Sequence, residues 1–262
     1  MNTEQLQPLA EMPNAFAQHG EDAIVMHVLD RIAAAGNPLD KWLVDVGCSD
    51  GVSMSNSARL IFERGYAGLL LEADPERAEL AYRNHAASDG VRVVTATVGH
   101  GKGDNILSFT SQHGCPHDCD FLSIDVDGMD YWLWADGGMR SKVVCIEFNH
   151  TIPPGCVYFQ PAGSFHAIGS SLDAIEKLAA SMGYTLVAVT RCNAIFCRTD
   201  LLPDGLGCRA REAREDFSAC LYVFHGYDGT VVAAGNAGSP WVRGFDMSGC
   251  VLQPRIAEGV RR

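Results

Sequence analysis

The sequence predicts an α/β protein with a doubly wound, mainly parallel sheet that ends in an antiparallel hairpin. Short aliphatic runs alternate with segments of helical periodicity, as expected when strands are joined by crossover helices. The first run, residues 42–47, stops in the glycine loop Gly47-Cys-Ser-Asp-Gly51, which opens toward a helix. In an open α/β sheet, a nucleotide-like ligand docks over the carboxyl end of such a strand.

The expected elements follow in order along the chain. An amphipathic helix is expected within residues 17–35, with Glu21 and Asp22 near its start, where the helix dipole favours acids. Seven strands are expected in one sheet, at residues 42–47, 68–72, 91–97, 120–125, 142–147, 184–189 and 194–198, the last two as a hairpin. Further helices are expected at residues 54–65, at 75–85 with proline in the first turn, after the fourth strand, and at 171–182 before Gly183.

Length and net charge limit the number of domains and the classes of function that the chain can have. The chain has 262 residues, 47% of them hydrophobic, and a net charge of −12. We expect a single domain over residues 1–262, with a core at 16–200, because doubly wound domains often reach about 200–250 residues. The glycine-rich residues 200–262 are interpreted as a lid, an added sheet edge, or an oligomer contact that would make a homodimer. The acidic balance argues against a nucleic-acid partner, which needs clustered Lys and Arg.

Compartment and cysteine usage are the next observations. The sequence shows neither a signal peptide nor an apolar run of about 18 residues, so we expect no membrane segment and a cytoplasmic location. The ten cysteines are then reduced thiols. Two of them flank a histidine in Cys115-Pro-His117-Asp-Cys119, which could hold zinc. No second pair lies at zinc-ribbon spacing, so a surface loop with incidental thiols is favoured.

The glycine loop also indicates the class of ligand. A dinucleotide fold uses G-x-G-x-x-G, which places a pyrophosphate on a helix N-terminus. Here Gly47 and Gly51 are spaced differently, and Asp45 and Asp50 lie beside them. These carboxylates would repel a pyrophosphate and suit a ligand with a cationic group, which disfavours an NAD-dependent oxidoreductase. Glu72 ends the next apolar run, about 20 residues further, where an acid can bind ribose hydroxyls. The alternative, a turn with no ligand, leaves Glu72 unexplained.

The loop resembles motif I of the Rossmann-like, S-adenosylmethionine (SAM) dependent methyltransferases, with Ser49 at the middle glycine of their D-x-G-x-G-x-G pattern. At the sequence level the chain is most similar to the FkbM-like methyltransferases. Three segments carry this resemblance: residues 16–22 (Phe-Ala-Gln-His-Gly-Glu-Asp), 45–51, and 123–128 (Ser-Ile-Asp-Val-Asp-Gly), of which the last is the most specific. The resemblance covers about residues 16–200. It implies methyl transfer from SAM, usually to an oxygen of a small-molecule, sugar or lipid-like acceptor, and leaves the acceptor open.

This resemblance and the loop together define an expected cofactor site. Glu72 would hold the ribose, the backbone around Gly47 would hold the methionine part with Asp45 or Asp50, and residues near Thr97 would line the adenine. The expected cofactor-binding residues are Gln18, Glu21, Asp45, Gly47, Cys48, Asp50, Gly51, Glu72, Ala73, Thr97 and Asp125.

Acids at the ends of the fourth and fifth strands suggest a metal. Asp125, Glu147 and Asn149 would reach the same rim of the crevice and form an all-oxygen set that suits Mg²⁺. Catechol-type O-methyltransferases are similar in the placement of such residues. Alternatively, these acids cap helices and bind the ligand without metal. Asp125-Val126-Asp127 also matches the D-x-D motif of nucleotide-sugar glycosyltransferases, which would leave the 45–51 loop and Glu72 unexplained.

The expected catalytic residues are Asp125 and His150. Methyl transfer is an in-line displacement in which positioning supplies much of the rate. The acceptor hydroxyl must also lose a proton, either because Mg²⁺ on Asp125 lowers its pKa or because a histidine acts as general base. His150 is the first candidate base and His166 the second. A binding module that keeps the fold without catalysis is a further alternative.

Aromatic residues flank the same strands. The proline-stiffened segment 151–161 follows the fifth strand, and we expect its Tyr158 and Phe159 either to contact the acceptor or to make ordinary loop packing. Tyr131, Trp132 and Trp134 lie on the helix after the fourth strand, where their spacing is typical of core residues.

Overall fold

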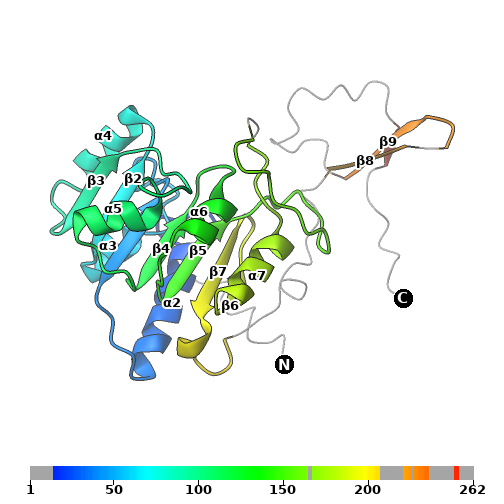
Figure 1. The fold of residues 1–262 in the computed structure, drawn as a ribbon. Coiled ribbons are helices and arrows are strands. Elements are labelled where there is room, and N and C mark those ends of the chain that lie inside the picture. The colour runs from blue at the N-terminus through cyan, green and yellow to red at the C-terminus, as the bar shows by residue number, and fades with distance from the viewer. Residues whose placement is uncertain (1–13, 165–166, 207–220, 226, 236–250, 254–262) are drawn as a thin grey trace.

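The computed structural model describes residues 14–164, 167–206, 221–225, 227–235 and 251–253 (Figure 1). Its main sheet has seven strands in the order β3-β2-β1-β4-β5-β7-β6. The strands are β1 (Trp42–Val46), β2 (Ala67–Glu72), β3 (Val91–Thr95), β4 (Phe121–Ile124), β5 (Val143–Glu147), β6 (Tyr184–Val189) and β7 (Asn193–Arg198). The neighbours from β3 to β5 are parallel, and β7 is antiparallel to both β5 and β6. The predicted Rossmann-like, doubly wound sheet with a closing antiparallel hairpin is thereby confirmed.

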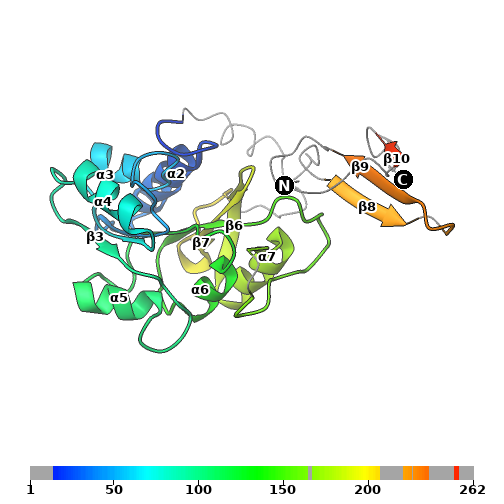
Figure 2. The same ribbon diagram turned by 90° about the horizontal axis from the view of Figure 1, so that it is seen from above.

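Helices cover both faces of this sheet. Figure 2 shows α2 (Glu21–Ala34), α3 (Ala58–Arg64) and α4 (Pro75–Asn84) on one face, and α5 (Ile106–His113), α6 (Asp130–Asp136) and α7 (Leu172–Ser181) on the other. Each face buries its own apolar cluster. Ile24 and Phe121 belong to the cluster beneath α2, whereas Trp134 and Phe196 belong to the one beneath α6 and α7. The two layers explain why the central strands are apolar at nearly every position.

Two helices differ from the expectation. α5 was not predicted; it begins after Asn105, whose side chain accepts the Ser108 N–H, and it ends at Gly114 in a left-handed conformation. α3 begins at Ala58 rather than at residue 54. The hydroxyl of Ser55 accepts the N–H groups of Ser57 and Ala58, so the serine-rich stretch forms a polar turn instead of a helical one.

The later part of the chain contributes a second, three-stranded sheet in the order β10-β9-β8. β8 (Leu221–His225) and β9 (Val231–Gly235) are antiparallel, and β10 (Val251–Gln253) is parallel to β9. A short 3-10 turn, η2 (Thr199–Leu201), follows β7. The roles proposed for residues 200–262 remain predictions. Among the described residues, no helix combines the length and the apolar character needed to cross a bilayer.

Candidate functional site

A cleft of about 610 Å³ lies at the carboxyl ends of the parallel strands. Its walls come from the loops that follow β1 to β5, the turn before β7, and the segment before α2. The strand order reverses between β1 and β4, and this reversal is where open α/β sheets bind ligands. Ligand pockets commonly measure about 300–1,000 Å³, so the cleft is large enough for a nucleoside with an attached side chain.

The glycine loop after β1 forms the floor of the cleft. A Cβ at Gly47 (φ 86°) would lie 1.8 Å from the backbone oxygen of Asp125, so only glycine allows this approach. The N–H groups of Gly47 and Cys48 both donate to the carbonyl of Leu71. Ser49 has φ 53°, the left-handed conformation in which glycine is favoured. Serine at the middle position of the motif therefore costs about 1–2 kcal/mol of strain and leaves the loop shape unchanged.

Glu72 joins this loop to the neighbouring one. Its side chain is buried at the end of β2, and its two carboxylate oxygens accept the N–H groups of Ser49 and Asp74, each at 2.8 Å. Each carboxylate oxygen can accept more than one hydrogen bond, so Glu72 can hold the loop and also accept from hydroxyls of a ligand. Ala73 and Thr97, two further predicted cofactor residues, line the same end of the cleft.

Asp45 lies deeper in the cleft among hydroxyl and amide groups. It accepts a 2.5 Å hydrogen bond from the hydroxyl of Ser57, and burial raises its pKa to about 6 although Ser57 and Ser123 oppose the shift. Asn56, whose side-chain amide donates to Ser123, also lines the cleft. Sequence analysis missed Ser55, Asn56 and Ser57. The signal was the polar run directly after the glycine loop, which we had assigned to a helix.

Asp50 and Gly51 do not line the cleft, unlike Gly47 and Cys48 in the same loop. The Asp50 carboxylate accepts the N–H groups of Val52 and Ser53, so it caps its own loop. Gly51 packs against His85, whose Nε2 lies 2.8 Å from the Gly51 carbonyl oxygen. In this structure Asp50 and Gly51 shape the loop, and their contact with a cofactor stays a prediction.

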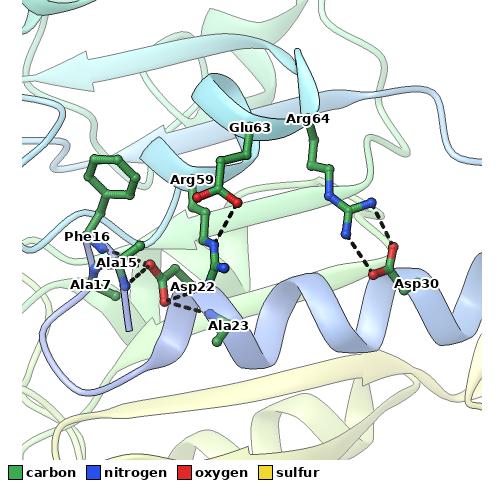
Figure 3. A network of polar contacts seen from close by, with 9 residues as sticks. All are labelled: Ala15, Phe16, Ala17, Asp22, Ala23, Asp30, Arg59, Glu63 and Arg64. Carbon is green, nitrogen blue, oxygen red and sulfur yellow. Dashed lines mark hydrogen bonds and ion pairs between the residues drawn. The ribbon is translucent and has the colours of Figure 1, made fainter. Parts of the chain in front are cut away.

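The segment before α2 is fixed by Asp22, as Figure 3 shows. The buried Asp22 carboxylate accepts the N–H groups of Ala15 and Phe16 at 3.0 and 2.9 Å, and a guanidinium nitrogen of Arg59 lies 4.0 Å away. A second pair, Arg64 with Asp30, links α3 to α2. These contacts hold the segment against the helix, so that the following Gln18 and His19 reach the wall of the cleft.

Glu21 does not line the cleft, and its role as a cofactor-binding residue stays a prediction. Its fully buried carboxylate accepts the N–H of His19 at 2.7 Å, the hydroxyl of Thr190, and the side-chain amide of Asn193 at 3.3 Å. Glu21 therefore ties the start of α2 to the turn before β7. Gln18 does line the cleft, and its side-chain oxygen accepts from the thiol of Cys192.

Three carboxylates gather at the β4–β5 end of the cleft. Oxygens of Asp125, Asp127 and Glu147 lie within 4.8 Å of one another. Asp127 adopts φ 57°, and Asp130 supports this loop by accepting the N–H groups of Val126 and Gly128. Burial, followed by repulsion from the neighbouring carboxylates, raises the pKa of Asp125 and of Glu147, which are hydrogen-bonded to each other. The pair therefore retains a proton where exposed carboxyls are ionised.

Asn149, the predicted third metal ligand, lines a second, smaller pocket together with Asp127 and Glu147. Its side-chain oxygen accepts from Thr151, and its amide donates to the carbonyl of Ile168 at 2.7 Å. Its backbone N–H donates to Ser170, so the chain has already left the β5–β7 ladder at this point. Asn149 therefore closes the following loop, and its role as a metal ligand stays a prediction.

The two predicted bases and the aromatic loop are placed as follows. His150 is buried and lines the cleft, whereas His166 lies outside the described residues. Tyr158 and Phe159 do not line the cleft. Phe159 stacks on Tyr131 with ring centroids 4.5 Å apart, and it meets Trp132 edge to face. Phe159 therefore makes loop packing, and Trp134 is a core residue as expected.

The Cys115–Cys119 segment forms no metal-type cluster. His117 Nε2 contacts the carbonyl of Gly138, and the buried Cys119 thiol contacts the hydroxyl of Ser141. Within the part of the chain that the structure describes, the carboxylates of the cleft are the group with metal-ligand spacing.

Comparisons with known proteins give no family and no close relative. No family model matches the chain, and neither does any curated protein. Similar solved structures include the CMeT domain of the citrinin polyketide synthase, with 11% identity, a TM-score of 0.45, and 70% of this chain covered. The chain spans 54% of that domain's length.

Two further similar structures contain SAM or its demethylated product. Magnesium protoporphyrin IX methyltransferase (ChlM) from Synechocystis PCC 6803, with bound SAM, has 14% identity and a TM-score of 0.40, with 68% of this chain and 78% of that chain covered. The N-terminal domain of EvdMO1, with S-adenosylhomocysteine (SAH) and D-fucose, has 10% identity and a TM-score of 0.43, with 74% and 93% covered. The likeness of this chain to these structures is one of fold.

Proposed function

We propose that this chain is a SAM-dependent methyltransferase of the FkbM-like kind, which methylates an oxygen of a small, sugar-like acceptor. One observation carries the proposal. A single cleft at the β1–β4 reversal has the Glu72 carboxylate at one end and the paired carboxyls of Asp125 and Glu147 at the other. The first end suits a ribose, and the second suits a group that must lose a proton.

The charges of the cleft fit this cofactor. SAM carries a sulfonium, an ammonium and a carboxylate, and it has no phosphate. In the proposed pose the ribose hydroxyls donate to Glu72, the adenine lies near Thr97, and the methionine part crosses Gly47 toward Asp45. Carboxylates along this path favour the cationic groups, whereas they would oppose the phosphates of a dinucleotide. The net charge of −12 supports a small-molecule acceptor over nucleic acid.

The reaction needs an orienting surface and a proton acceptor. The bond between the methyl carbon and the sulfonium sulfur breaks, and its electron pair stays on sulfur to leave SAH. A bond forms between that carbon and the acceptor oxygen, whose proton passes to a base. Asp125 and His150 both line the cleft and are the proposed bases. A carboxyl with a raised pKa is suited to this role, because a general base works best when its pKa is near the operating pH.

The cysteines support the proposed cytoplasmic location. The seven cysteines of the described residues are all free thiols. Six of them are buried or half-buried, so they contribute to packing, and a reducing compartment would preserve them.

Calorimetric titration of SAH into the protein tests this function. We expect one site per chain, and we expect Glu72→Ala to weaken binding by about 1–3 kcal/mol, the cost of removing a hydrogen-bonded charged partner. Glu79→Ala, an exposed acid on α4, is the matched control and should leave SAH affinity unchanged. Failure to bind SAH would contradict the proposal. Binding of a sugar nucleotide instead would favour the glycosyltransferase interpretation of Asp125 and Asp127.

A further inference from the structure

Strand register places Asn193 beside the carboxylate cluster. Cys145 of β5 pairs with Ile195 of β7, and both face the apolar cluster beneath α2. Two residues nearer the cleft, Glu147 pairs with Asn193, so these side chains lie side by side on the same face. Asp125 lies on the same face as Glu147 and Asn193. On β4, Ser123 pairs with Cys145 of β5, and Asp125 comes two residues later. Its N–H still donates to Val46 of β1, so the strand geometry continues to this residue.

Asn193 brings an amide oxygen that lacks a partner. Its side chain is 2% exposed and lines the cleft. Its amide nitrogen donates to Glu21, which orients the group and directs the oxygen away from that carboxylate. Among the described residues, nothing donates a hydrogen bond to this Oδ1 atom. A buried polar atom left unsatisfied destabilises the protein, so such an atom in the cleft wall, on the residue opposite Glu147, indicates a ligand.

We propose that the side-chain oxygen of Asn193 completes a divalent-cation site with Asp125, Asp127 and Glu147. The role of this cation, though not the site itself, rests on the proposed function, since a cation in this position would hold the acceptor oxygen near the methyl donor. The amide ligand that the sequence placed at Asn149 is supplied from β7 instead. Register brings it there from a strand that runs in the opposite direction.

The donor set selects a hard cation. Three carboxylates and an amide oxygen suit Mg²⁺, Mn²⁺ or Ca²⁺, whereas zinc sites use thiolate or imidazole ligands. Cys48 and Cys192 also line the cleft, but burial raises the pKa of both thiols, and the thiolate is the form that binds metal.

A divalent ion also fits the charge better than an ammonium group. Asp125, Asp127 and Glu147 repel one another, which contributes to the raised pKa of Asp125 and Glu147. A single positive charge would offset one carboxylate, whereas a divalent ion offsets two and orders the oxygens around itself. An amine acceptor is therefore the outcome that the experiment below must distinguish.

Titration of the full chain with Mn²⁺ in the absence of SAH tests the site, and electron paramagnetic resonance measures the concentration of free Mn²⁺. We expect one Mn²⁺ per chain, displaced by Mg²⁺. Asp127→Asn should weaken binding at least about tenfold, and this exposed residue can change without disturbing the core. Asp89→Asn, an exposed acid elsewhere, should bind as the unmodified chain does. Absence of Mn²⁺ binding, or an unchanged affinity in Asp127→Asn, would overturn the site.

A pair of variants tests Asn193 itself, with folding of each checked by circular dichroism. Asn193→Ala should lose affinity at least about tenfold, and Asn193→Asp, which keeps an oxygen at this position, should retain it. Equal affinity in the alanine and aspartate variants would remove Asn193 from the site. If the alanine variant does not fold, the aspartate variant decides, and lost binding there would overturn the assignment. Since SAH is absent from these measurements, their failure is separate from failure of the proposed function.

Discussion

The carboxylates at the two ends of the cleft have different hydrogen-bond partners. At the β1–β2 end, Glu72 accepts two backbone N–H groups, and Asp45 accepts a hydroxyl. At the β4–β5 end, Asp125 and Glu147 have each other and Asp127 as neighbours, and repulsion among them contributes to their raised pKa. The first end is already organised by the chain's own donors. The second end holds negative charge that a ligand or a proton must offset.

Under the proposed function, this difference would let one end of the cleft bind the cofactor and the other prepare the acceptor. Donors built into the backbone fix the carboxylates that would receive the cofactor, so little reorganisation accompanies its binding. At the other end, burial and mutual repulsion destabilise the charged carboxylates in the free protein. Relief of this destabilisation on binding would add to the affinity for a cation. Four substitutions and one change of pH test this contrast.

The largest effect is expected from Gly47→Ala, which disturbs the contact between the two ends. The new Cβ would lie 1.8 Å from the Asp125 oxygen, so β1 and β4 must separate. We expect the free energy of unfolding in urea to fall by about 3–5 kcal/mol. Gly36→Ala is the control, because it also has positive φ but meets no atom within 4 Å, and strain alone should cost about 1–2 kcal/mol. Equal losses in both variants would show that the close contact is unimportant.

The pH dependence of stability should reveal the buried carboxyls at both ends. A carboxyl whose pKa is raised by folding stabilises the protein fully below its unfolded pKa, and this contribution is lost as pH rises through the folded pKa. The pKa is raised for Asp45, to about 6, and for Asp125 and Glu147. In EDTA, the melting temperature should therefore fall from pH 5 to pH 8. A constant or rising melting temperature would contradict the assignment.

Glu147→Gln should sharpen the same contrast. Folding keeps the Glu147 carboxyl protonated at a pH where it ionises in the unfolded chain, and glutamine removes this cost, so we expect the metal-free variant at pH 8 to gain about 1–2 kcal/mol in the free energy of unfolding. Glu176→Gln on α7 serves as the control for a carboxylate remote from the cleft. Chemical denaturation at pH 8 and pH 5 is the measurement, and the gain should shrink at pH 5, where the pair is more fully protonated. A loss of stability at pH 8 would count against the raised pKa of Glu147.

Ser57→Ala tests the β1–β2 end, where the carboxylates accept hydrogen bonds from the chain. The hydroxyl of Ser57 is the close donor to Asp45, and its removal leaves a buried carboxylate with one partner fewer. We expect a loss of about 1–2 kcal/mol at pH 8 by urea denaturation. Ser181→Ala, at an exposed position whose hydroxyl bonds a helix carbonyl, should change stability far less.

The smallest effect is expected from Phe159→Ala. This residue contributes the stack on Tyr131 and no wall of the cleft, so we expect a loss of about 0.5–1.5 kcal/mol and unchanged SAH affinity. Val157→Ala, another exposed residue of the same loop, is the control. A large loss of SAH affinity would instead place Phe159 at the ligand.

Sequence reasoning reached the features that depend on local pattern. Strand periodicity located the sheet, and the glycine loop located Gly47 and Glu72 in one crevice, because successive parallel strands end at the same edge. Asn193 could not be found in this way, because its place depends on β7 lying next to β5, which puts Asn193 opposite Glu147. The buried setting of Glu21 also depends on a distant residue, since its partner Thr190 is 169 residues away in sequence. The position of Asp127 near Asp125 and Glu147 goes with its left-handed conformation, which no periodicity predicts.

The direction of β7 has a consequence for how related enzymes would diverge. A parallel strand meets the cleft at its end and continues into a crossover helix, so new contacts there arise by lengthening a loop. β7 meets the cleft at its beginning, after a tight turn closed by the Thr190 N–H and the Asn193 carbonyl. Arg191 and Cys192 of that turn line the cleft. Selection can therefore alter this wall one side chain at a time, without insertions and without moving the strands on either side.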